Sequence, residues 1–247
     1  MKNVNFLGDC FEILPTIKND SVDLILTDPP YLISRESNFK KVSKHTPEDL
    51  KTKYNISIDF GEWDNTDLDW SLLFKEYSRI LKKGGTLIMF WDIWKATTIK
   101  SLADSVKFKQ SRIGAWIKTN PVPINSKLNY LSNATEYFFT FVKGSKPTFN
   151  SEYDKGFYSY PICHGKKRLN HPTQKPLQLI KDLILKHSNE GEIVLDNFAG
   201  SFTTGQAAIE TSRYFIGIEK DAMYFGLGEE RLSKLNISQT IEYKNKN

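Results

Sequence analysis

Residues 191–221, "GEIVLDNFAGSFTTGQAAIETSRYFIGIEKD", carry the pattern that decides the fold. A short apolar run ends at Asp196, a tight glycine-containing loop and a helical segment follow, and a second apolar run ends at Glu219. We interpret the stretch as strand, loop, helix and strand. This unit is typical of parallel sheets with helices packed against them.

The same alternation continues through most of the chain. Further strands are predicted at 21–28, 84–91, 111–118 and 134–144. Helices are predicted at 67–85, where the basic "KKGG" would form the last turn and a glycine stop, and at 175–188. We therefore expect an α/β fold in a single domain, 1–247, with a mainly parallel sheet and helices on both faces.

Composition excludes several classes of protein. The two cysteines have no CxxC spacing and the four histidines include no close pair, so we expect no disulfide framework and no metal site. The apolar runs are too short to span a membrane, and the amino terminus lacks the apolar core of a signal peptide. We expect a cytoplasmic protein with no membrane partner.

Positive charge is concentrated in one part of the chain. Residues 100–175 carry thirteen lysines and arginines against four acids, within a total net charge of +5. Such a segment favours contact with a polyanion such as nucleic acid. The alternative is an ordinary solvated surface.

Distinctive residues follow three of the predicted strands: "DPPY" at 28–31, "DNFAGSFTTG" at 196–205 and "GIEKD" at 217–221. Ligands of open parallel sheets bind at the carboxyl ends of the strands, so we expect the three to converge on one crevice. Gly200 allows a tight turn, and Ser201, Thr203 and Thr204 are candidate caps of the next helix. With Glu219 placed to bind ribose hydroxyls, they indicate a nucleoside-containing cofactor; the alternative is a capped helix beside a surface acid.

The "DPPY" segment suits the positioning of an amino group. Asp28 and the carbonyl of Pro29 can accept both hydrogens of one amine, which leaves its nitrogen free to attack an electrophile. The two prolines fix this geometry in advance, and Tyr31 offers a face on which a nucleobase can stack. The alternative is a strand ended by prolines, with Tyr31 in the core.

With "HPTQKP" at 171–176, these motifs resemble those of the DNA amino-methyltransferases, which use S-adenosylmethionine. The order, catalytic motif first and cofactor loop last, is that of the permuted class called β. The resemblance implies a Rossmann-like fold with permuted motif order, encoded by a bacterium, an archaeon or a phage. We expect a mobile loop at 34–58 near the active site and a small target-recognition region within 119–170.

Residue by residue, the resemblance implies a catalytic motif of Asp28, Pro29, Pro30 and Tyr31. It implies a cofactor site of Asp9, Cys10, Phe11, Asp28, Thr173, Lys175, Asp196, Phe198, Gly200, Ser201, Thr203 and Glu219. In this site Lys175 would meet the cofactor carboxylate and Asp9 would lie by the adenine. The alternative is that Lys175 is a surface lysine and Asp9 only caps a helix.

The cofactor loop departs from the family pattern at two positions. Asn197 stands where the family usually has proline, and Phe202 where it usually has a second glycine. Such a glycine can serve a positive φ or a close approach of the cofactor. We expect the Phe202 side chain to point away, into the packing between sheet and helix. The alternative is an inactive, DNA-binding homologue that has lost the cofactor.

Double-stranded DNA is the expected substrate, with a target base flipped out of the helix. An acid at the first motif position, Asp28, favours adenine N6 over cytosine N4 in this family and argues against a protein amide. Neither Cys10 nor Cys163 has the Pro-Cys context of cytosine C5 chemistry. Phosphate contacts are expected from Lys166, Lys167 and Arg168. The resemblance leaves room for a homodimer and for a cognate restriction endonuclease, and the sequence decides neither.

Overall fold

The computed structural model describes residues 3–30, 68–121, 131–144, 146–163, 174–235 and 240–245. The strands are β1 (Asn3–Leu7), β2 (Val22–Thr27), β3 (Leu81–Phe90), β4 (Lys109–Lys118), β5 (Thr135–Val142), β6 (Phe157–Tyr160), β7 (Ile193–Asp196), β8 (Tyr214–Glu219) and β9 (Ile241–Asn245). The α-helices are α1 (Cys10–Ile13), α3 (Trp70–Ile80), α4 (Ala96–Ser105), α5 (Leu177–His187), α6 (Thr203–Glu210) and α7 (Ala222–Ser233). Single 3-10 turns are η1 (Leu14–Thr16) and η3 (Ile93–Lys95).

The chain divides into two compact units. The first, Met1–Pro29 with Asp69–Asn247, contains all of the elements given above. Of the second, Pro30–Leu68, only the two end residues are described. In the described part of the chain, no helix has the length and apolar character needed to cross a membrane.

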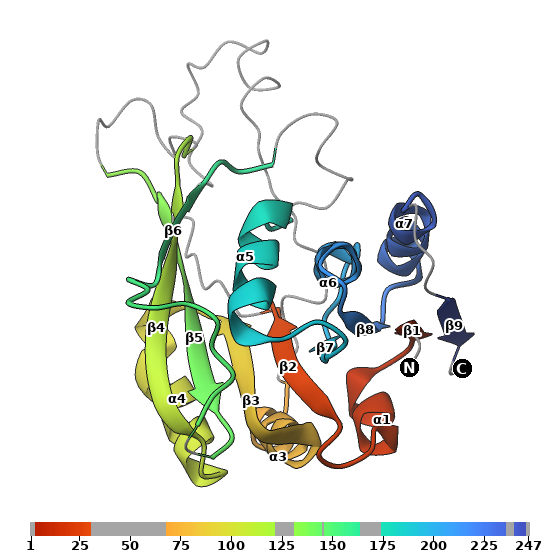
Figure 1. Ribbon diagram of the computed structural model, residues 1–247, viewed down its shortest axis with the longest axis horizontal. Coiled ribbons are helices and arrows are strands. Elements are labelled where there is room, and N and C mark those ends of the chain that lie inside the picture. The colour runs from red at the N-terminus through yellow and green to blue at the C-terminus, as the bar shows by residue number, and fades with distance from the viewer. Residues whose placement is uncertain are drawn as a thin grey trace, which may run out of the picture. The chain divides into compact units, whose positions relative to one another are not determined.

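The nine strands form one sheet in the order β6-β4-β5-β3-β2-β7-β8-β1-β9 (Figure 1). Every pairing in it is parallel except those that β5 makes with β3 and β4. The predicted α/β fold with a mainly parallel sheet is therefore confirmed. The central strand β2, "VDLILT", is buried along its whole length, as expected for a strand with neighbours on both sides and helices on both faces.

The helices cover both faces of the sheet. On one face, α5, α6 and α7 pack on the inward side chains of β2, β3 and β7 in one continuous core (Figure 1). On the other face lies α3, whose buried Phe74 contacts the rings of Phe108 and Phe141. α3 begins at an aspartate cap, since Asp69 accepts a hydrogen bond from the Leu72 amide.

The predicted helix at 67–85 is too long at its carboxyl end. α3 ends at Ile80, and "KKGG" belongs to β3 rather than to a last helical turn. Leu81 is fully buried and pairs with β2, and the Gly84 amide donates to the Lys143 carbonyl at 2.7 Å. The pairing of β3 on both sides explains why these residues extend the strand. The edge strands β6 and β9, and β1 beside β9, had no sequence prediction.

Candidate active site

Consecutive strands bring the predicted motifs to one edge of the sheet. β2, β7, β8 and β1 lie side by side and run in the same direction, so Asp28, Asp196, Glu219 and Asp9 follow neighbouring strand ends. The predicted convergence of three strand ends is confirmed, and the end of β1 joins them. The chain leaves β7 toward β8 and β2 toward β3, in opposite directions along the sheet, which makes the β2–β7 boundary a switch point.

Asp196 connects the elements at this switch point through hydrogen bonds. Its carboxylate accepts hydrogen bonds from the Thr27 hydroxyl at 2.9 Å and the Thr204 hydroxyl at 2.7 Å, and from the Phe198 amide at 3.1 Å. It therefore links β2, β7 and the first turn of α6. Burial raises the pKa of Asp196 to about 6, despite these three donors. This predicted cofactor residue lies beneath the loop and fixes its position.

The cofactor loop is held to the end of β8 by Glu219. One carboxylate oxygen accepts from the Gly200 amide at 2.7 Å and the other from the Asp221 amide at 2.8 Å. Gly200 has φ 51°, the left-handed region where a glycine is favoured, as the predicted tight turn requires. Burial raises the pKa of Glu219 to about 7, so a ligand that donates hydroxyl hydrogens would stabilise its charged form.

Phe202 occupies a left-handed position and fills the core beside it. Its φ is 57°, so this site does favour a glycine backbone. The ring is fully buried, with centroids 6.1 Å from Phe215 and 5.4 Å from Phe225, and it lies on Gly228 of α7. The expectation that this side chain enters the sheet–helix packing is confirmed.

The second departure, Asn197, is also integrated into the protein. Its side-chain oxygen accepts a hydrogen bond from the Tyr77 hydroxyl at 2.9 Å. Both side chains are buried, and the bond connects the loop to α3. An asparagine at the family's proline position therefore anchors the loop by a side chain rather than by a fixed φ.

The prediction that hydroxyl side chains cap the next helix is wrong. The cap position of α6 is Phe202, which makes no side-chain hydrogen bond there. The hydroxyls of Thr203 and Ser201 instead accept from the buried guanidinium of Arg231 on α7, at 2.6 and 3.4 Å. The guanidinium offers several donors at a fixed spacing, and burial lowers its pKa to about 10.

The residues after β1 form the far side of the site. Asp9 caps α1 by accepting from the Phe11 amide at 2.9 Å, and it pairs with Lys220 at 2.9 Å. Asp9 therefore does cap a helix, and its predicted place by the adenine stays a prediction. Cys10 is buried, and burial raises its thiol pKa to about 12, which does not suit a nucleophilic thiolate.

Asp28 lies in a group of partly buried charges at the end of β2. Its Oδ2 contacts the Lys175 ammonium, which is also 3.3 Å from Glu136 Oε2. The Lys118 ammonium, the fourth charge of this group, lies 2.8 Å from Glu136 Oε1. Burial raises the pKa of Asp28 and outweighs the opposing effect of Lys175. Lys175 is only 6% exposed, so the alternative of a surface lysine is wrong.

Several predicted residues lie outside the described ranges: Tyr31, Lys166, Lys167, Arg168, Thr173 and the whole loop 34–58. The predicted target-recognition region, 119–170, is described in part and contributes β5 and β6 to the sheet. Its role in recognition stays a prediction. Among the residues that are described, no group of three potential metal ligands comes together.

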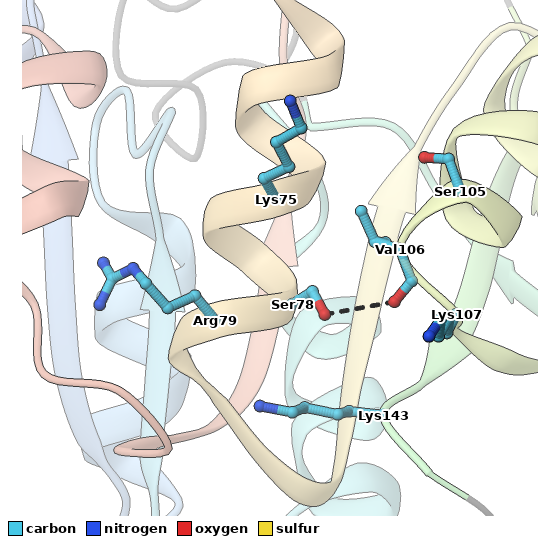
Figure 2. A pocket seen from close by; sticks show the side chains of 7 residues that line it. All are labelled: Lys75, Ser78, Arg79, Ser105, Val106, Lys107 and Lys143. Atoms are coloured by element: carbon cyan, nitrogen blue, oxygen red, sulfur yellow. Dashed lines mark hydrogen bonds between the residues drawn. The ribbon is translucent and has the colours of Figure 1, made fainter.

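A basic hollow elsewhere in the protein is distinct from this site. Lys75 and Arg79 of α3, Lys107 after α4 and Lys143 after β5 line it (Figure 2). These segments meet at the amino end of β3, the edge opposite Asp28. Figure 2 shows the Lys75 and Arg79 side chains pointing in different directions. Arg79 pairs with Glu76 and donates hydrogen bonds to the backbone carbonyls of Leu14 and Ile17. These contacts give it a structural role.

Several described contributors to the site were not predicted from the sequence, among them Tyr77, Lys118, Glu136 and Arg231. Each acts on a residue far away in the chain, so no local motif indicates it. Glu136 did leave a signal, because it is a lone acid in the aromatic strand "TEYFFTFV". An acid within a largely buried strand needs a specific partner.

An α/β sheet with a tight glycine loop and acids at its switch point is typical of Rossmann-like folds that bind ligands at this edge. The chain matches the family model described as DNA methylase (N6_N4_Mtase) over residues 22–230. It is 31% identical to the Type II methyltransferase M.HinfI of Haemophilus influenzae, over 94% of this chain and 69% of that protein. It is 28% identical to M2.MboI of Moraxella bovis, over 99% and 93% of the two chains.

Solved structures agree with this. The crystal structure of the M1.HpyAVI-SAM complex has a TM-score of 0.67 and 26% identity, covering 92% of this chain and 99% of that one. The cytosine-N4-specific PvuII DNA methyltransferase has a TM-score of 0.73 at 18% identity, covering 98% and 95%, and shows the shared fold. The chain belongs to the DNA methylase family of amino-methyltransferases.

Proposed function

We propose that this chain transfers a methyl group from S-adenosylmethionine to the N6 amino group of adenine in double-stranded DNA. The observation that carries the proposal is Asp28, an acid at the switch point with its Oδ1 buried and without a hydrogen-bond donor among the described residues. A buried acceptor of this kind lacks the donor that an amino group would supply. Membership of the DNA methylase family supports the reaction class.

The residues present fit the cofactor. The carboxylate oxygens of Glu219 can accept hydrogen bonds from ribose hydroxyls. The loop that Glu219 holds contains Phe198, Gly200 and Ser201, and Thr203 follows it at the start of α6. Bound S-adenosylmethionine would supply an electrophilic methyl carbon. The M1.HpyAVI structure, 26% identical, is titled as a complex with SAM, which supports a cofactor of this kind here.

Asp28 and the carbonyl of Pro29 then hold the two hydrogens of the target amine and aim its nitrogen lone pair. The rigid proline turn limits the entropy lost in this alignment. The amine is the nucleophile, so no covalent bond to the chain forms, and the high thiol pKa of Cys10 agrees with this. As its nitrogen gains the methyl group, it would release one proton through the Asp28 carboxylate to solvent, and the rest of the cofactor would leave as a thioether. Tyr31 remains the predicted stacking partner of the flipped base.

Adenine is preferred because the family resemblance associates an acid at position 28 with N6 methylation. The fold of the PvuII enzyme, which is specific for cytosine N4, does not distinguish the two bases. A homodimer and a cognate restriction endonuclease stay predictions, as do the phosphate contacts of Lys166, Lys167 and Arg168.

Nucleoside analysis tests the choice of base. The chain is incubated with S-adenosylmethionine and unmethylated duplex DNA, which is then digested to nucleosides and analysed by mass spectrometry. N6-methyladenine is expected. N4-methylcytosine would contradict the target and retain the mechanism, whereas unmodified DNA together with absent cofactor binding would favour the inactive homologue.

A further inference from the structure

Four charged side chains alternate in sign along the edge of the sheet: Lys118, Glu136, Lys175 and Asp28. Lys118 is the last residue of β4 and Glu136 the second of β5. Because β5 is antiparallel to β3, its amino end lies at the same edge as the carboxyl end of β2. The sheet topology thus brings both residues to Asp28, while Lys175 reaches it from just before α5.

The Lys175 ammonium lies between two carboxylates that compete for it. It contacts Asp28 and is 3.3 Å from Glu136 Oε2, which has no well-aligned hydrogen-bond donor among the described residues. It also lies 4.8 Å from the centre of the Phe90 ring, within reach of a cation–π attraction. A small movement of the ammonium would therefore exchange its contact with Asp28 for one with Glu136.

This arrangement creates a conflict with the proposed reaction. Asp28 Oδ1 is open to the target amine, but the ammonium on Oδ2 neutralises the charge of the shared carboxylate and so weakens Oδ1 as an acceptor. Burying two ammonium groups with two carboxylates is also costly, and such groups often add little to stability. A second acceptor for Lys175 resolves the conflict.

We propose that Glu136 is a positioning residue for methyl transfer, the acceptor that takes the Lys175 ammonium when the target amine occupies Asp28. Lys118 holds Glu136 in place and keeps it ionised; its ammonium and that of Lys175 hold the pKa of Glu136 below its usual value, although burial alone would raise it. This inference rests on the proposed function and goes beyond it, because it assigns a role to a residue outside the predicted motifs.

The variant Glu136→Gln tests the proposal, since it keeps the side-chain size and removes the charge. Lys175 then has Asp28 as its carboxylate partner in this group, so the tighter ion pair at Oδ2 leaves Oδ1 a weaker acceptor for the amine. We expect kcat/KM for duplex DNA to fall by roughly tenfold or more, while the Kd for S-adenosylmethionine changes less than about twofold.

The pH profile separates positioning from a structural role. Among the described residues, the charged groups facing Asp28 are Lys175, Glu136 and Asp196, with Lys118 behind Glu136. The negative charge of Glu136 raises the pKa of Asp28, so Glu136→Gln should move the acid limb of kcat/KM to lower pH. Lys118→Gln removes a positive charge and leaves Glu136 to Lys175, which should move the limb to higher pH.

Glu210→Gln is the matched control. Glu210 is 27% exposed, as Glu136 is, and pairs with Lys181 at 2.5 Å, at the end of α6 away from the loop. This control should retain wild-type kinetics, and Glu136→Asp, which keeps the charge, should retain the wild-type acid limb. Circular dichroism verifies that each variant is folded.

Opposite shifts of the acid limb in Glu136→Gln and Lys118→Gln support the proposal. It is overturned if both variants keep the wild-type profile, or if Glu136→Gln weakens cofactor binding and catalysis equally without a shift. Failure of the proposed function is a different result, because a folded wild-type chain would then transfer no methyl group, and the role of Glu136 would be overturned with it.

Discussion

Replacing Phe202 with glycine, the residue that the family resemblance places there, should destabilise the protein. The ring is 0% exposed and makes edge-to-face contacts with two other phenylalanines. Loss of a buried phenyl group costs about 3–5 kcal/mol, and release of the left-handed backbone returns about 1 kcal/mol. The net cost is therefore about 2–4 kcal/mol, which urea unfolding followed by circular dichroism measures. An unchanged or higher free energy of unfolding would refute this reasoning.

Gly228 provides an internal control for the same contact. A Cβ at this position would lie 2.4 Å from Phe202 Cδ2, so Gly228→Ala should cost about 1–3 kcal/mol in the wild-type chain. In a Phe202→Ala background the space is open, and the gain in helix propensity should make the same change neutral or stabilising by about 1 kcal/mol. Additive effects of the two changes would show that the ring does not occupy this position.

Two further predictions concern the loop. Burial raises the pKa of Glu219 from 4.5 to about 7, so the stability that its proton contributes is complete below about pH 4.5 and is lost as the pH rises to about 7. Glu219→Gln should flatten the dependence of unfolding free energy on pH in this window, and an unchanged slope would contradict the assignment. Tyr77→Phe leaves the buried Asn197 oxygen without its donor and should cost about 1–3 kcal/mol in urea unfolding. A cost below roughly 0.5 kcal/mol would mean that this hydrogen bond does not anchor the loop.

The central strands and the strand-end motifs were predictable because buried parallel strands are short apolar runs. "VDLILT" and "IVLD" have few polar residues, and the acids that follow them mark where each strand ends. Parallel neighbours share one edge, so the meeting of Asp28, Asp196 and Glu219 followed from the order of the elements. The resemblance of the motifs supplied the reaction class.

The end of α3 was mispredicted because local signals conflicted with tertiary pairing. "KKGG" has the composition of a helix terminus, yet Leu81 and Gly84 pair with strands that lie far away in the sequence. The expected hydroxyl caps failed for a similar reason. The hydroxyls of Ser201 and Thr203 contact Arg231, about 30 residues away.

The charge group around Asp28 could not be read from the sequence. Its members come from β2, β4, β5 and the segment before α5, and only the sheet order brings them together. The family motif indicated Lys175 but gave no reason to pair it with Asp28. Glu136 is an isolated acid in an aromatic strand. This pattern indicates that the acid has a partner, but it does not identify the partner.

Methyl transfer by the wild-type chain and by Asp28→Ala tests the central claim most directly. Labelled S-adenosylmethionine and unmethylated duplex DNA are the substrates, and calorimetry measures cofactor binding in parallel. We predict transfer by the wild-type chain and a loss of roughly a hundredfold or more in the variant, with cofactor affinity retained, because Asp28 positions the amine. Transfer by Asp28→Ala at the wild-type rate would contradict this account.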